Sequence, residues 1–159
     1  MARRFARAEG GARAIGSAPK NWGKNVSLIG ALTLEGLTST MSIDGSVDGD
    51  VFAIYVEQVL GPALRPGDVV VMDNLNVHKG PAISRAIEAH GARLMWLPPY
   101  SPDFNPIEQA WLKIKTALRS AAARSREALD QAITHAIQWV TRQDAIAWFQ
   151  GCGYQPQLC

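Results

Sequence analysis

The stretch Val69-Val-Val-Met-Asp73 decides how this sequence folds. A short, continuously apolar run rich in valine is typical of a strand that is buried on both faces, as strands of parallel sheets are. Sheets of that kind occur in α/β proteins, where helices cover both faces. Asp73 follows the run directly, at the carboxyl end of the expected strand, where the ligand and catalytic sites of α/β sheets collect.

The segments on either side of this strand alternate between strand and helix patterns. Downstream, Pro81 occupies a first helical position and Gly91 lies where a helix stops. Upstream, Glu35-Gly36 is a turn signal between two apolar stretches and predicts a hairpin. The fold class is therefore α/β, with a mixed sheet and helices on both faces. We expect strands at 26–34, 37–43, 69–73 and 92–97, and helices at 48–62, 81–90, 105–121 (capped by Asn105) and 126–141.

The composition is that of a single globular domain. The chain has 159 residues, of which 47% are hydrophobic and 19% charged, enough to build one core. No apolar run approaches the roughly 20 residues that span a bilayer. Cys152 and Cys159 have no metal-ligand spacing, so we interpret them as free thiols in a reduced cytoplasmic setting. We expect a basic irregular arm at 1–24, the folded domain at 25–150 and a loose tail at 151–159.

Two carboxylates stand out by their positions, Asp73 after the buried strand and Glu108 in the first turn of the helix at 105–121. A strand, a helix and a Pro-rich loop between them can return the second carboxylate to the first. Carboxylates that converge repel each other unless a cation is present, and oxygen ligands suit Mg²⁺ or Mn²⁺. Local structure offers alternatives: Asp73-Asn74 also fits a turn, and Glu108 also completes a capping box with Asn105.

Two longer stretches carry a resemblance to a known family. They are Met72-Asp-Asn-Leu-Asn-Val-His-Lys-Gly80 and Leu97-Pro-Pro-Tyr-Ser-Pro-Asp-Phe-Asn-Pro-Ile-Glu-Gln-Ala-Trp111. Together they resemble the two C-terminal catalytic blocks of mariner-superfamily transposases, in the bacterial insertion-sequence branch of the DDE endonucleases. The likeness extends through the hairpin and helix at 25–62 and so covers most of the chain.

The resemblance implies a ribonuclease-H-like fold and an Asp, Asp, Glu triad that binds two Mg²⁺ or Mn²⁺ ions. Asp73 takes the place of the second Asp and Glu108 that of the Glu, while Asn74, His78 and Asn105 match the residues that flank them. The implied reaction is metal-dependent cleavage of DNA at insertion-sequence ends, followed by strand transfer. It proceeds by attack of water and then of a DNA 3′-hydroxyl, so that two ions about 3.5–4 Å apart serve the attacking and leaving oxygens.

The sequence departs from the family at its start. The family carries its first Asp on the first strand of the sheet, ahead of an Arg-rich stretch, and here that stretch begins almost at Met1. We therefore expect a truncated sheet without its first strand, and a chain that is inactive alone. Asp44, Asp48 and Asp50, in the loop that leaves the hairpin, are the nearby acids that could substitute for the missing ligand.

Basic residues indicate DNA as the partner, although the net charge is only +2. One basic cluster lies in residues 1–24 and a second in residues 109–126, and both can neutralise phosphates, as can Lys79 beside the site. For the second cluster, a solvated helix face is the alternative. The candidates for DNA contact are Arg3, Arg4, Arg7, Lys79, Lys113, Lys115 and Arg119.

The function hypotheses differ in what the chain does by itself. In the first hypothesis the chain is a catalytic fragment, and its parent enzyme is a homo-oligomer associated with the nucleoid in a bacterial cytoplasm. In the second it is an inactive remnant that binds DNA or a full-length transposase. A third hypothesis makes it one half of a split element that receives its missing N-terminal segment by association or frameshifting.

Overall fold

A computed structural model of the chain describes residues 9, 10, 12 and 25–155. Apart from residues 9, 10 and 12, the expected arm at 1–24 lies outside the described residues. Arg3, Arg4 and Arg7 are among the residues that are not described. Residues 156–159, including Cys159, lie outside as well. Within the described part, no helix has the length and apolarity that crossing a membrane requires.

The order of elements follows the alternation that the sequence predicts. In the described part of the chain, four strands and four helices lie near the positions that the patterns predict, and a fifth helix follows. The strands are β1 (Val26–Thr33), β2 (Gly36–Asp44), β3 (Val69–Met72) and β4 (Arg93–Trp96). The α-helices are α1 (Gly49–Tyr55), α2 (Pro81–Ala89), α3 (Ile107–Ala121), α4 (Arg126–Gln138) and α5 (Arg142–Gly151). A π-helical turn (Val56–Leu60) and 3₁₀ turns (Gly61–Ala63, Asn76–His78, Pro102–Phe104) complete the list.

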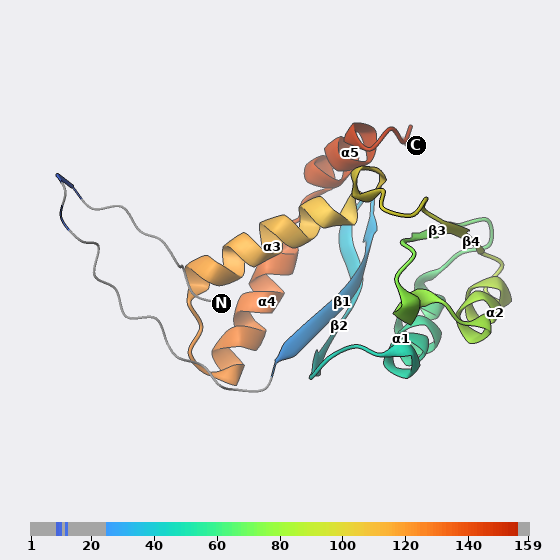
Figure 1. Ribbon diagram of the computed structural model, residues 1–159, viewed down its shortest axis with the longest axis horizontal. Helices are drawn as coiled ribbons and strands as arrows, with labels where there is room; N and C mark the ends of the chain where they lie inside the picture. The colour runs from blue at the N-terminus through green and yellow to red at the C-terminus, as the bar shows by residue number, and fades with distance from the viewer. Residues whose placement is uncertain (1–8, 11, 13–24, 156–159) are drawn as a thin grey trace.

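The four strands form two separate two-stranded sheets. β1 pairs with β2 in an antiparallel hairpin, and β3 pairs with β4 in parallel, with Val69 opposite Arg93 and Met72 opposite Trp96. Figure 1 shows the hairpin in the middle of the molecule, with α3 and α4 on one side and α1, α2, β3 and β4 on the other.

The hairpin is apolar on both faces and forms a wall between two cores. Along β1, Ile29 and Ala31 pack against the core of α1, α2 and β3, while Leu28 and Leu32 pack against the core of α3 and α4. This alternation is the period of two that a strand imposes. The register shifts between Ile29 and Ala31, opposite Ser39, which has a positive φ of 45°.

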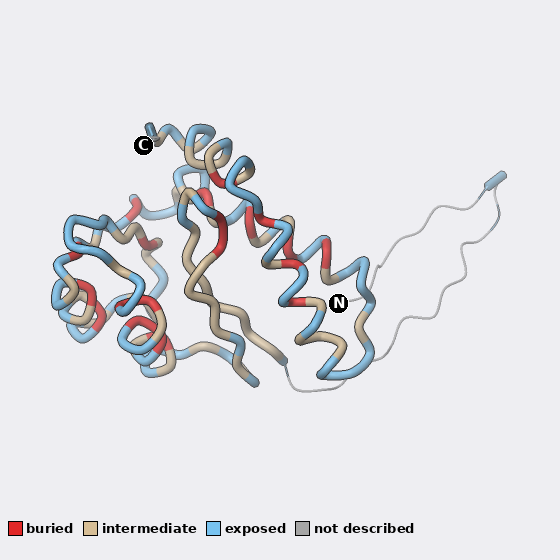
Figure 2. The backbone as a smooth tube through the Cα atoms, turned by 180° about the vertical axis from the view of Figure 1, so that it is seen from behind, coloured by how far each residue is buried: buried red, intermediate tan, exposed pale blue. Residues whose placement is uncertain are grey.

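The burial of the helices confirms this division. Figure 2 shows the buried positions on the inner sides of the helices on both sides of the hairpin. One core centres on Tyr55, Val56 and Ile87, which are at most 2% exposed. The other contains Ala110, Ala117 and Ala136, small residues that let α3 and α4 approach closely.

Two helices end differently from the sequence pattern. The expected helix at 48–62 is α-helical only to Tyr55 and continues as the π turn Val56–Leu60. The 3₁₀ turn Gly61–Ala63 follows, and Pro62 at its start has no N–H to continue the helical ladder. The expected helix at 126–141 ends at Gln138, and α5 begins at Arg142. Thr141 and Asp144 form a capping box that starts α5, and this signal overrides continuation of α4.

Ion pairs fasten the two ends of the hairpin to the helices. Arg142 pairs with Glu35 at the hairpin tip, and Arg126 pairs with Asp44 at the other end. The tip approaches the α4–α5 junction so closely that a Cβ on Gly36 would lie 2.6 Å from the carbonyl oxygen of Val140. Gly36 also has a φ of +120°, so both its backbone and its surroundings favour glycine.

Replacing Gly36 with alanine tests this close approach. We expect Gly36→Ala to lower the free energy of unfolding by the backbone strain of about 1–3 kcal/mol plus the cost of displacing Val140. Gly45→Ala is the matched control, because Gly45 has a φ of +105° with nothing within 4 Å of the added carbon. Equal losses for both variants in urea unfolding would show that the hairpin tip does not press on the helix junction.

Candidate active site

Asp73 is held in place by its own loop. Its Oδ1 accepts a hydrogen bond from the Leu75 backbone N–H at 3.1 Å and lies 2.7 Å from Nδ1 of His78. Both contacts fall on the same oxygen, so Oδ2 has no protein partner within the described part of the chain. The contacts to Oδ1 thus orient the carboxylate, and Oδ2 is left available to bind a ligand.

His78 lies between Asp73 and the core formed by α1, α2 and β3. The turn Asn76–His78 places its ring 4.3 Å from the ring of Phe52, at an interplanar angle of 38°. Its side chain is 19% exposed, and the buried Nδ1 approaches Asp73 without a well-directed hydrogen bond. Its position favours a role in holding the carboxylate rather than direct access to a substrate.

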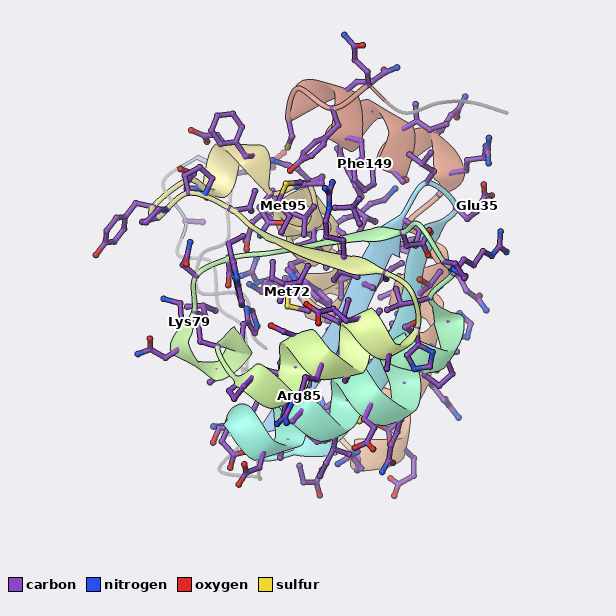
Figure 3. The ribbon with its side chains drawn as sticks, turned by 90° about the vertical axis from the view of Figure 1, so that its right-hand side faces the viewer. Glu35, Met72, Lys79, Arg85, Met95 and Phe149 are labelled. Atoms are coloured by element: carbon purple, nitrogen blue, oxygen red, sulfur yellow. The ribbon has the colours of Figure 1, made fainter. Side chains whose placement is uncertain are left out.

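Asn74 points to a different place from Asp73. Its Nδ2 donates to the carbonyl oxygen of Leu97, which ties the end of β3 to the end of β4. With Lys79 and Trp96 it lines a shallow depression outside the cavity that Asp73 borders. Figure 3 shows Lys79 at the far end of the loop that follows β3.

Glu108 lies in the first turn of α3, but the cap of that helix differs from the expectation. The N-cap residue is Pro106, and no side chain caps the helix, so the predicted Asn105 cap is wrong. Asn105 has an extended backbone after the 3₁₀ turn Pro102–Phe104, and its carbonyl oxygen accepts from the Glu108 N–H at 3.2 Å. Glu108 is exposed, so no capping box occupies its carboxylate.

The segment after α5 packs against this loop, in a place where the sequence predicts a loose tail. Tyr154 donates a hydrogen bond from its hydroxyl to the carbonyl oxygen of Phe104 at 2.9 Å. Its ring meets Phe149 edge-on, with centroids 5.7 Å apart. Burial raises the pKa of the Tyr154 hydroxyl. The turn that leads into Glu108 is therefore fastened from fifty residues away in sequence.

Four of the predicted site residues line one open cavity of about 940 Å³. They are Asp73, His78, Asn105 and Glu108. Asp44, Asp48 and Asp50 do not. Instead, Asp44 pairs with Arg126, and Asp48 caps α1 by accepting from the Val51 N–H at 2.9 Å. Among the described residues, no group of three His, Cys, Asp or Glu side chains is placed to hold a metal ion.

The basic residues of α3 divide between two faces. Lys113 lies 2.6 Å from Asp144 of α5, and this contact is the main reason that the pKa of Asp144 falls to about 2. Lys115 and Arg119 are exposed, and within the described chain neither lies within ion-pair distance of a carboxylate. Helical spacing places them in one stripe with Glu108.

The contact between Tyr154 and the loop can be tested without any activity. We expect Tyr154→Phe to remove one hydrogen bond, a change of about 0.5–1.5 kcal/mol, and to speed amide exchange at residues 104–108. Hydrogen–deuterium exchange with mass spectrometry measures it. Tyr100→Phe is the control, because Tyr100 is fully exposed in the same loop. If both variants exchange like the unchanged protein, Tyr154 does not hold the loop.

The arrangement of elements is similar to that in solved structures of Mos1 transposase. The structure titled as the Mos1 strand transfer complex matches with a TM-score of 0.65 and 16% identity, over 96% of this chain and 46% of that chain. The Mos1 mariner paired-end complex with Mn matches with a TM-score of 0.61 and 13% identity, over 96% and 47%. This chain thus spans less than half the length of those chains, and it shares their ribonuclease-H-like fold.

A sequence profile provides the family. No curated protein sequence matches the chain. The profile described as DDE superfamily endonuclease matches residues 1–130, which is most of the sequence. By this match, the chain belongs to the DDE superfamily of endonucleases.

Proposed function

We propose that this chain is part of the catalytic domain of a transposase that cleaves DNA at the ends of an insertion sequence and transfers the strands. The observation that carries the proposal is the shared cavity of Asp73 and Glu108 in a chain of the DDE endonuclease superfamily. In this reaction water, and then a DNA 3′-hydroxyl, attacks a phosphate, so no protein nucleophile is needed. The bacterial branch and a nucleoid-associated, cytoplasmic setting are part of the same proposal.

The family implies a divalent metal ion, and the residues at the cavity fit one in part. Asp73 offers an oriented carboxylate with one oxygen unengaged, and Glu108 offers an exposed one. Oxygen ligands suit Mg²⁺ and Mn²⁺. When two ions are bound, they stabilise the attacking and leaving oxygens. Asp73 and Glu108 would hold them, His78 would keep Asp73 oriented, and Asn105 would set the start of the helix that carries Glu108.

The donor set of the described residues is incomplete, which supports a chain that does not cut DNA by itself. Three acidic residues line the cavity, but Asp68 precedes β3 and its Oδ2 already accepts from the Arg65 N–H at 2.8 Å. A bridging ligand for two ions would therefore have to come from elsewhere than the described residues. We propose that the complete enzyme contains a further N-terminal catalytic segment, and that it acts as a homo-oligomer. The second candidate function is a non-catalytic one, in which the chain binds DNA or a full-length transposase as a regulator. The exposed basic stripe without a complete carboxylate set favours this second candidate.

DNA would run along α3. Glu108, Lys115 and Arg119 share an exposed stripe, so a backbone whose phosphates meet the two cations would lead toward the carboxylate. Lys113 belongs to the opposite face, where Asp144 already neutralises it. The predicted role of Lys113 in DNA binding is therefore weaker than that of its neighbours, and Lys79 and Arg3, Arg4 and Arg7 remain candidates.

The salt dependence of DNA binding tests which basic residues of α3 contact DNA. We expect the double variant Lys115→Ala, Arg119→Ala to weaken binding to any duplex and to reduce the slope of log affinity against log salt by about two. Lys113→Ala is the comparison and should leave the slope nearly unchanged. Fluorescence anisotropy with one labelled duplex between 50 and about 200 mM salt gives both values. If the double variant leaves the slope unchanged, the stripe is a solvated helix face that does not contact DNA.

Cleavage tests the catalytic proposal. We expect the 159-residue chain alone not to nick supercoiled plasmid in Mg²⁺ or Mn²⁺. Fusing to it the upstream catalytic segment and DNA-reading domain of a family relative should restore metal-dependent nicking. In that fusion Asp73→Asn or Glu108→Gln should abolish nicking and leave the circular dichroism spectrum intact.

Two results would contradict this view. Robust nicking by the chain alone, lost on Asp73→Asn, would mean that its ligand set is already complete and would return attention to Asp44, Asp48 and Asp50. Nicking by the fusion that survives Asp73→Asn and Glu108→Gln would remove both residues from the site.

A further inference from the structure

The helix that carries Glu108 begins without a capping side chain. Its N-cap residue is Pro106, and the Glu108 N–H donates to the carbonyl oxygen of Asn105 at the long distance of 3.2 Å. The first turn of a helix frays when its N–H groups have weak partners or none. The position of the Glu108 carboxylate therefore depends on what holds the residues that precede it.

The end of α5 directs Tyr154 to this place. The Tyr154 N–H donates to the carbonyl oxygen of Phe149 at 3.0 Å, and the Gly153 N–H donates to that of Gln150, also at 3.0 Å. Gly153 has a φ of +87°, and the rings of Phe149 and Tyr154 are in contact. These features form a Schellman motif, which fixes the direction in which the chain leaves a helix. As a result the Tyr154 hydroxyl reaches the carbonyl oxygen of Phe104.

The start of α5 is fastened to α3 itself. Lys113 Nζ lies 2.6 Å from Asp144 Oδ2. The same oxygen accepts hydrogen bonds from the backbone N–H and the hydroxyl of Thr141, at 2.9 and 2.7 Å. Further along α5, Ala145 is fully buried and Trp148 packs against the core of α3 and α4. The helix is thus held on α3 at its start and reaches the loop before α3 from its end.

These contacts close a ring that contains Glu108. The ring runs from Lys113 through α5 to Tyr154, and then through Phe104 into the first turn of α3. Figure 1 shows α5 lying beside the start of α3. Tyr154 also lines the cavity that Glu108 borders, so the ring reaches the candidate site.

We propose that α5 and the residues up to Tyr154 form a bracket that positions the Glu108 carboxylate to bind a metal ion together with Asp73. Tyr154 is the positioning residue, and Lys113 acts through it from the other end of α5. The ammonium group of Lys113 then serves the position of the carboxylate and not the binding of DNA. This inference deepens the proposed function and rests on it for the role of Glu108 as a ligand, whereas the bracket itself requires neither metal nor DNA.

Hydrogen–deuterium exchange of the full chain tests the bracket. Gly153→Ala strains the left-handed residue of the Schellman motif, and Lys113→Ala removes the ion pair. We expect each to speed exchange at residues 104–108 by about threefold or more, as the loss of one hydrogen bond does. Gly151→Ala is the control for the first, because Gly151 is helical and has nothing within 4 Å of the added carbon. Lys113→Arg is the control for the second, because arginine keeps the charge. Neither control should speed exchange, and circular dichroism checks that every variant folds.

A pair of substitutions distinguishes action through α5 from a local effect on α3. Lys113 lies in the same helix as Glu108, so its replacement could loosen that helix directly. If Lys113 acts through the bracket, Lys113→Ala should not speed exchange further in a protein that already carries Tyr154→Phe. Additive effects of the two substitutions would show that Lys113 acts within α3 and would overturn the role assigned to it.

Titration with Mn²⁺ tests whether the bracket serves the metal site. Bound Mn²⁺ broadens the NMR signals of amides close to it, so the signals of residues 74–75 and 107–109 report on Asp73 and Glu108 separately. We expect both groups of signals to broaden together in the unchanged chain. In Gly153→Ala the broadening should be largely lost at 107–109 and should persist at 74–75, whereas Gly151→Ala should behave like the unchanged chain.

Three results would overturn the proposal. Unchanged exchange at residues 104–108 in both Gly153→Ala and Lys113→Ala would mean that α5 does not hold the loop. Equal effects of Gly151→Ala and Gly153→Ala would mean a general loosening of α5. Faster exchange with an unchanged pattern of Mn²⁺ broadening would mean that the bracket does not set the position of the carboxylate. If Mn²⁺ broadens no signal near Glu108 in the unchanged chain, the proposed function is contradicted instead, because Glu108 is then not a ligand, and the exchange data still decide whether the bracket exists.

Discussion

The β1–β2 hairpin is the constraint on which the rest of the molecule depends. Both of its faces are apolar, so helices must cover it from two sides, and each side becomes a core of its own. The register shift near Ser39 lets the two strands agree on which residues face which core: Ile29 lies opposite Met41 on one side, and Leu32 opposite Leu37 on the other. Without a wall of this kind, Asp73 and Glu108 would stand on unrelated substructures.

The candidate site is built from both halves. Asp73 and His78 belong to the side of the first core, where Phe52 supports the histidine ring. Glu108 begins a helix whose inner face packs into the second core. Tyr154, after α5, donates a hydrogen bond to the loop that leads into α3 and so to Glu108. Such an arrangement places the two carboxylates by packing over long sequence distances, while each one is oriented by local contacts.

Local signals made much of this predictable from sequence. The valine run identified β3 and its carboxyl end, Pro81 and Gly91 delimited α2, and Glu35-Gly36 marked the hairpin, because each signal acts within a few residues. The resemblance is confirmed for the DDE endonuclease superfamily and for the fold. Long-range contacts could not be predicted: nothing in the tail indicated that Tyr154 would reach Phe104, and the capping box that starts α5 was concealed by the helical pattern before it. At Asn105 a local rule failed, because the preceding 3₁₀ turn leaves that residue extended and moves the cap to Pro106.

Within residues 25–155, β1 and β3 each keep an unpaired edge, and such edges make the behaviour of a chain depend on its concentration. Edge strands without cover pair with whichever strand is most abundant, including those of identical molecules. In dilute solution that competition favours the monomer, whereas at high concentration it favours irregular assemblies whose growth rises with each added copy.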